Sequence, residues 1–236
     1  MRRFFLLLLL MPASACGSTS PYATTSGILQ PGASLTVQIA QGRLDAYQPA
    51  AGERGDLFTV SATALPKTTP RAPRARALGK NVTISAGALA SLLVRVPAGV
   101  KLIVDSREGD VNVTDISGSA TIAARHGNVT AMLPEYAEAT VGEGTLAVTM
   151  GAAHWPGTLH FSVERGDIIL RVLAIAAFGV HLQTQNGTLF TDFGLRGSSQ
   201  GNSETIDGSV NGGGSQRIWA QTGQGAIRLL RLQPQP

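Results

Sequence analysis

A short motif recurs seven times in this chain and limits its fold more than any other feature. Each copy has a glycine, then a small or polar residue, then an aliphatic residue. The copies are Gly109-Asp110-Val111, Gly127-Asn128-Val129, Gly144-Thr145-Leu146, Gly166-Asp167-Ile168, Gly187-Thr188-Leu189, Gly208-Ser209-Val210 and Gly225-Ala226-Ile227. They follow one another at intervals of 17 to 22 residues, which is the spacing of a solenoid, a stack of similar coils.

Alternating apolar residues precede most copies. Leu159, Phe161 and Val163, for example, stand seven, five and three residues before Gly166, with more polar residues between them. A period of two is typical of a strand with one buried face. Each repeat therefore predicts two short strands joined at the glycine. We expect an all-β fold: a single-domain, parallel β-helix-like solenoid with a repeat of about 19 residues.

The composition agrees with this fold and excludes some functions. Of 236 residues, 28 are Gly and only one is Cys, and charged residues make up 14%. Abundant Gly, Val and Thr favours strands and turns over helix interiors. A single Cys excludes an internal disulfide and a cysteine-cluster metal site. The formal net charge is +4, but no nucleic-acid-binding motif is present, so we expect no nucleic-acid partner.

The N-terminus predicts export from the cytoplasm. Arg2 and Arg3 precede an apolar run, Phe4 to Met11, which is typical of a signal peptide and too short to span a bilayer. The next residues, Ala13-Ser14-Ala15-Cys16, resemble the lipobox of bacterial lipoproteins, in which the cysteine becomes the acylated first residue of the mature chain. An ordinary secretory cleavage site is the alternative. We expect an extracytoplasmic protein that Cys16 anchors to a membrane of the cell envelope.

The chain divides into five predicted parts. Residues 1–15 are the signal peptide, 16–31 the lipidated cysteine and a flexible tether, 32–96 an N-terminal β cap, 97–232 the solenoid repeats and 233–236 a tail.

The predicted cap contains a basic, proline-rich segment at residues 66–80. Its cationic residues are Lys67, Arg71, Arg74, Arg76 and Lys80. Its prolines exclude a central strand and favour an exposed loop. Such a loop on a tethered protein can contact anionic lipid, lipopolysaccharide or acidic wall polymers. A solvated linker between cap and solenoid is the alternative.

Two stretches carry a resemblance to a known family. The segments 93–102 and 106–111, with the closing glycines Gly212-Gly213-Gly214 and the segment 223–227, resemble bacterial envelope proteins of the DUF4097 family, called adhesins or toastrack domains. The resemblance covers about residues 32–232. It implies a right-handed stack of strands, extracytoplasmic exposure and, in some relatives, a link to envelope stress. It implies no catalytic residues.

No motif for catalysis is found. The sequence has no His-Glu-x-x-His zinc motif, no Gly-x-Ser-x-Gly nucleophile elbow and no phosphate-binding loop. Asp110 and Asp167 follow repeat glycines, where we expect them to cap backbone N–H groups. We therefore predict a protein that is not an enzyme and has no cofactor.

One alignment of polar residues suggests a metal site. The repeat places Glu138, His160, His181 and Asn202 on successive coils of the outer face. If so, His160 and His181 stack about 4.8 Å apart beside Glu138 and could share a transition-metal ion. We prefer the other interpretation, a solvated row of side chains without a ligand, and predict no metal site.

Together these features predict a non-enzymatic, adhesin-like binding or scaffolding module. Its expected partners are the membrane, through the lipid anchor, and an envelope protein, glycan or anionic lipid. A stress-sensing or self-associating component is one alternative, because solenoid ends expose unpaired strands. A glycan-active enzyme is another, and requires acidic residues clustered in a groove.

Overall fold

The computed structural model describes residues 22–49, 56–65 and 71–233. Within these ranges the chain forms 19 strands and no helix, which confirms the all-β prediction. Accordingly, the described part of the chain holds no helix that could cross a membrane.

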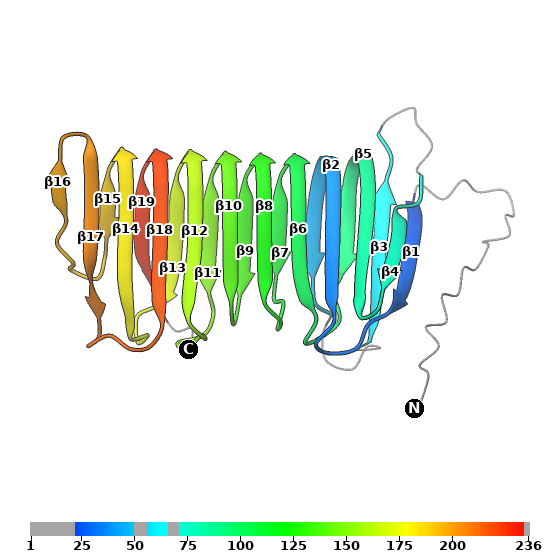
Figure 1. Cartoon of the computed structure of the whole chain (residues 1–236), viewed down its shortest axis with the longest axis horizontal. Coiled ribbons are helices and arrows are strands. Elements are labelled where there is room, and N and C mark those ends of the chain that lie inside the picture. Colours follow the sequence, from blue (N-terminus) through cyan, green and yellow to red (C-terminus); the bar gives the residue numbers. More distant parts are fainter. Residues whose placement is uncertain (1–21, 50–55, 66–70, 234–236) are drawn as a thin grey trace, which may run out of the picture.

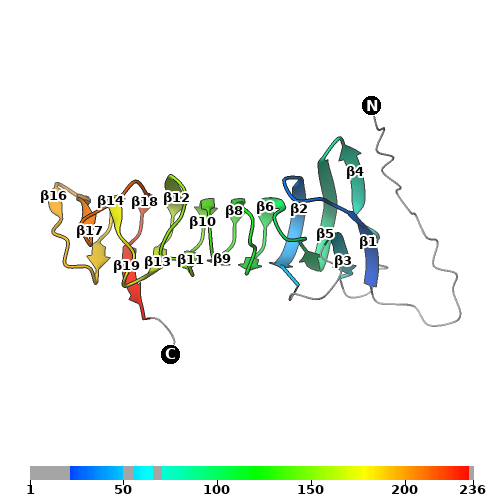
Figure 2. The same ribbon diagram turned by 90° about the horizontal axis from the view of Figure 1, so that it is seen from below.

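The strands form two facing layers, with the long stack of coils running between the two ends of the molecule (Figures 1 and 2). Layer A contains, in spatial order, β4 (Arg74–Leu78), the first part of β5 (Asn81–Arg95), the first part of β2 (Ser34–Tyr47), β6 (Lys101–Glu108), β8 (Ala120–His126), β10 (Ala137–Glu143), β12 (Thr158–Arg165), β18 (Arg217–Gln224), β14 (Phe178–Asn186), β17 (Ser203–Val210) and β16 (Ser198–Gln200). Layer B contains β1 (Tyr22–Ile28), β3 (Leu57–Thr63), the second parts of β5 and β2, β7 (Val111–Thr114), β9 (Val129–Leu133), β11 (Leu146–Met150), β13 (Ile168–Leu173), β19 (Ile227–Leu232) and β15 (Leu189–Thr191).

The core lies between the layers and consists of aligned aliphatic side chains. In the central coils Val104, Ile122 and Ala139 stand opposite one another in a parallel register, and all three are buried. Every second residue points inward in this way, so the burial pattern of β8 alternates between buried and exposed. The parallel solenoid predicted from the repeat is confirmed.

The repeat glycines line one corner of the stack. In spatial order they are Gly42, Gly109, Gly127, Gly144, Gly166, Gly225 and Gly187. At Gly127 the backbone has φ 133°, and an added Cβ would collide with the carbonyl oxygen of Gly109 on the next coil. Only glycine therefore fits this position.

Two glycines depart from the predicted repeat. Gly208 lies inside β17, which runs antiparallel to β14, so its motif does not form a corner. Conversely, Gly42-Arg43-Leu44 has the same pattern and does form a corner. It was not counted among the repeats because it lies inside the predicted cap.

Turn residues after the corner glycines hydrogen-bond from coil to coil. The Asp110 carboxylate accepts the backbone N–H of Asn128 at 2.9 Å, and the Asp167 carboxylate accepts that of Ala226 at 2.8 Å. The predicted capping role of both aspartates is confirmed.

The spatial order of the coils differs from the order in the sequence at two places. The β18–β19 coil lies between β12–β13 and β14–β15, although it follows them in the chain. Likewise β2 lies between β5 and the β6–β7 coil. The consecutive stack predicted from the repeat is therefore wrong at the C-terminal end, and β2, which was predicted as part of the cap, pairs directly with the first repeat coil.

The boundaries at the N-terminal end also differ from the prediction. Residues 22–28, placed in the tether, form strand β1, which pairs antiparallel with β3. Residues 74–78, placed in an exposed loop, form the edge strand β4. The signal peptide, Cys16 and the last three residues of the tail lie outside the described residues.

Candidate functional site

A row of polar and aromatic side chains crosses the outer side of layer A. Strand register places its members side by side in this order: Glu138, His160, Trp219, His181 and Asp207. They come from β10, β12, β18, β14 and β17, and we call them the Trp219 row. Every second side chain of these strands points into the core, so the intervening side chains project outward on the same face.

Trp219 separates the two histidines that were predicted to stack. Its ring centre lies 5.6 Å from that of His160 and 6.0 Å from that of His181, and the planes of Trp219 and His181 differ by only 12°. The insertion of β18 between β12 and β14 is the reason. The part of the chain that the structure describes contains no group of three or more His, Cys, Asp or Glu able to hold a metal ion. His160, His181 and Glu138 therefore do not form a shared metal site here.

Asn202, the fourth residue in that alignment, lies elsewhere. It occupies the turn between β16 and β17, and its side-chain amide donates to the Asn186 side-chain oxygen at 3.2 Å. The antiparallel hairpin at this end replaces the coil that the alignment assumed.

The ends of the Trp219 row are held by short hydrogen bonds. The Tyr136 hydroxyl donates to Glu138 at 2.6 Å. At the other end, the His181 Nδ1 atom lies 2.6 Å from the Asp207 carboxylate. These contacts fix the polar groups on each side of the indole, so the row is a preorganised surface.

We expect Tyr136 to titrate unusually late. Burial, together with the hydrogen bond to Glu138 and the negative charge there, raises its pKa to about 12. The pKa of Tyr136 in the folded protein lies above its ordinary value, so the neutral phenol stabilises the folded state. This contribution to the free energy of unfolding is complete below about pH 10 and is lost as pH rises towards 12. Absorbance titration of tyrosinate should show a late step that Tyr136→Phe removes. If the substitution instead removed a step near pH 10, the ordinary value for tyrosine, the raised pKa of Tyr136 would be contradicted.

A second, uncharged row runs beside the Trp219 row. It consists of Ser162, Gln221, Gln183 and Thr205, placed side by side by the same register. The Gln221 amide donates to the Ser162 hydroxyl at 3.2 Å. Amides and hydroxyls both donate and accept hydrogen bonds, so the two rows together form a polar surface around a partly exposed Trp, with one carboxylate at each end of the Trp219 row.

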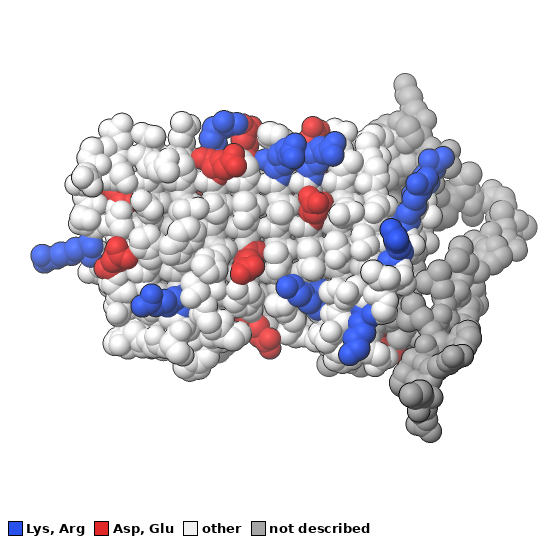
Figure 3. All heavy atoms as spheres, in the orientation of Figure 1, with Lys and Arg blue, Asp and Glu red and all other residues white. Residues whose placement is uncertain are grey.

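Charges on the outer side of layer A lie mainly away from these rows. Figure 3 shows Lys, Arg, Asp and Glu side chains gathered along the edge where β6, β8, β10 and β12 end, with isolated charged side chains over the rest of the face. At that edge Glu143 contacts both Arg165 and His126. These exposed ion pairs contribute little stability, and their signs balance.

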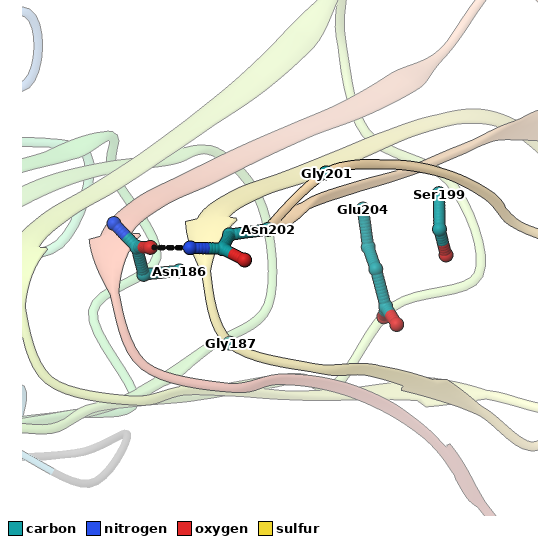
Figure 4. Close-up of a pocket in the computed structure, with 6 residues that line it drawn as sticks. All are labelled: Asn186, Gly187, Ser199, Gly201, Asn202 and Glu204. Carbon is teal, nitrogen blue, oxygen red and sulfur yellow. Dashed lines mark hydrogen bonds between the residues drawn. The ribbon is translucent and has the colours of Figure 1, made fainter.

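Two shallow hollows lie at the C-terminal end of the stack. One is lined by Asn186, Gly187, Ser199, Gly201, Asn202 and Glu204 (Figure 4). The other lies beside it, and Glu204 is the one carboxylate among its lining residues too. The Glu204 carboxylate accepts a hydrogen bond from the backbone N–H of Leu189 at 2.7 Å and so covers the edge of β15. Neither hollow holds the pair of acidic groups that the glycan-active enzyme alternative requires.

The described members of the basic segment lie at the N-terminal edge of layer A. Arg74 and Arg76 are exposed on β4, opposite Ser85 and Thr83 of β5. Lys67 lies outside the described residues. Arginines on an edge strand discourage another chain from pairing with it, which accounts for these two charges without a ligand.

Comparisons with known proteins give two structural likenesses. No family model and no curated protein matches the chain, so the DUF4097 resemblance stays a prediction. A candidate cell adhesion protein from Clostridium sporogenes has a TM-score of 0.46 at 11% identity, covering 89% of this chain and 100% of its own. A candidate adhesin from Bacteroides fragilis has a TM-score of 0.36 at 9% identity, covering 88% and 96%. At these scores the likeness assigns no partner or activity to this chain.

Proposed function

We propose that this protein is a non-enzymatic, adhesin-like binding module of the bacterial cell envelope, anchored to a membrane through acylated Cys16. The outer side of layer A, centred on Trp219, is its binding surface, and a hydroxyl-rich envelope glycan is the ligand class that suits it.

The observation that carries the proposal is the position of Trp219. A partly exposed Trp lies in the middle of a flat strand surface, between two imidazoles and beside a row of amides and hydroxyls. Trp is prominent among residues that dominate binding energy, and convergent polar groups fix a ligand's orientation. The solenoid interior serves to keep this surface rigid.

Three of the four strand edges at the ends of the stack argue for this function over self-association; the fourth is the uncharged strand β1. On layer A the stack ends at three-residue β16 and at β4 with its arginines, and on layer B the edge of three-residue β15 is covered by Glu204. Short, charged or covered edges are the features by which sheets avoid pairing with other chains.

Fluorescence tests the binding surface directly, because the chain has two Trp residues. Trp155 is buried at 5% exposure, whereas Trp219 is partly exposed. Titration with purified envelope polysaccharide should change the emission of the wild-type protein and of Trp155→Phe, but not of Trp219→Phe. A change that persists in Trp219→Phe, or no change in the wild type, would overturn the assignment of layer A as the glycan site.

A further inference from the structure

The outer side of layer B differs in charge from that of layer A. The described strands of layer A carry seven basic and seven acidic residues: Arg74, Arg76, Lys101, Arg107, Arg125, Arg165 and Arg217 against Asp105, Glu108, Glu138, Glu143, Glu164, Glu204 and Asp207. The outward positions of the layer B strands carry four arginines and one acid: Arg43, Arg95, Arg171 and Arg228 against Asp45. A fifth arginine, Arg231, shares the register of buried Val172 and lies over the Phe193 ring. The one acid already accepts hydrogen bonds from Arg43 and Asn112. Layer B is therefore cationic.

Layer B also carries most of the exposed apolar side chains. Of the eight large apolar residues that are well exposed in the described part of the chain, five lie on layer B strands: Ile28, Tyr47, Leu93, Met132 and Phe190. Met132 is 48% exposed and Phe190 is 53% exposed. Exposed apolar groups that gather on one side mark an interaction surface.

At the C-terminal half of layer B the two kinds of side chain alternate. Register places Ile169, Arg228 and Phe190 side by side on β13, β19 and β15. In the next row, Met132 lies across one strand from Arg171, which neighbours Leu230. We call these six residues the layer B patch. Arginines interleaved with apolar side chains match an interface between lipid headgroups and acyl chains, where apolar groups insert and cations meet phosphates.

The N-terminal end of the described chain places one end of layer B, the end opposite to the layer B patch, near the membrane. Strand β1 begins at Tyr22 and forms the edge of layer B (Figure 2). Five residues lie between Cys16 and its first residue, which makes six residue steps, and extended chain spans at most about 3.3–3.6 Å per step, or roughly 20 Å in all. An acyl anchor on Cys16 therefore holds the edge of layer B within that distance of the bilayer.

We infer that layer B lies on an anionic phospholipid surface, contacting it through the layer B patch. This inference rests on the anchoring part of the proposed function. It orients the molecule, because layer A then faces away from the membrane and presents the Trp219 row to the surroundings.

Vesicle binding of the acyl-free mature chain, residues 16–236, tests this inference. The chain should co-sediment with vesicles containing phosphatidylglycerol and not with phosphatidylcholine vesicles, and salt should weaken the binding. Each arginine near such a surface contributes about fivefold in affinity. Arg171→Gln with Arg228→Gln should therefore bind at least tenfold more weakly, and Phe190→Ser should weaken binding further.

A matched control removes the same charge from the other layer. Arg74→Gln with Arg76→Gln should bind like the wild type, and circular dichroism should show that all variants retain their strands. Equal losses in both double variants would mean that net charge alone drives binding, and would overturn the inference. So would the absence of binding to any vesicle, which would indicate a protein partner for layer B. Trp219→Phe should bind vesicles normally, so failure of the glycan assignment is a separate result.

Discussion

Replacing Gly144 with Ala should lower the free energy of unfolding by at least about 3 kcal/mol. Gly144 has φ 140°, a conformation that residues with a Cβ rarely adopt. An added methyl would also collide with the carbonyl oxygen of Gly127 on the neighbouring coil. Neighbouring strands are held about 4.8 Å apart by their hydrogen bonds, so the coils cannot separate locally to make room. Urea denaturation followed by circular dichroism measures the loss.

Gly87 provides the matched control for this substitution. It is an exposed glycine of β5 with open space where a Cβ would stand and without a positive φ. Gly87→Ala should change stability by no more than about 0.5 kcal/mol, or increase it slightly, because Ala restricts the unfolded chain. If both variants lost similar stability, the corner would not be the cause, and the account of the glycine repeat would be wrong.

The repeat predicted the architecture because up to three constraints coincide in one coil. Gly166-Asp167-Ile168, for instance, combines a corner that only glycine fits, a capping carboxylate and an inward aliphatic residue. Each constraint is local, so it can be recognised without knowing which coil lies next to it. For the same reason the outward direction of Glu138, His160 and His181 could be predicted, because it depends only on the alternation within a strand.

The order of the coils could not be predicted in this way. Any coil with a period-two interior can stack on any other, and Ile218 of β18 fits equally against neighbours on either side, Leu159 and Val180. The choice depends on contacts between distant loops. This is why the sequence alignment placed His160 beside His181 and missed Trp219, which stands between them.

Gln216 holds the inserted coil in place, and its replacement tests that explanation. It is buried, with 5% exposure, just before β18 begins. Its side-chain oxygen accepts the backbone N–H of Trp155 at 3.0 Å. Its amide donates to the carbonyl oxygens of Ala153 at 2.9 Å and Ala177 at 2.7 Å. One side chain thus joins the loops that precede β12 and β14 to the start of the strand between them.

We expect Gln216→Leu to lower the free energy of unfolding by about 2 kcal/mol or more, because three backbone groups, one buried and two partly buried, lose their partner, and a fully buried group without a partner costs about 1–3 kcal/mol. Gln216→Glu should be at least as damaging, since a carboxylate cannot donate to the two carbonyls and buries a charge. Gln221→Leu, on the outer side of the same strand, should cost less than about 1 kcal/mol. Native-state hydrogen exchange should show the loss first in β18 and β19. Protection retained there in Gln216→Leu would mean that strand pairing alone holds the inserted coil between its neighbours.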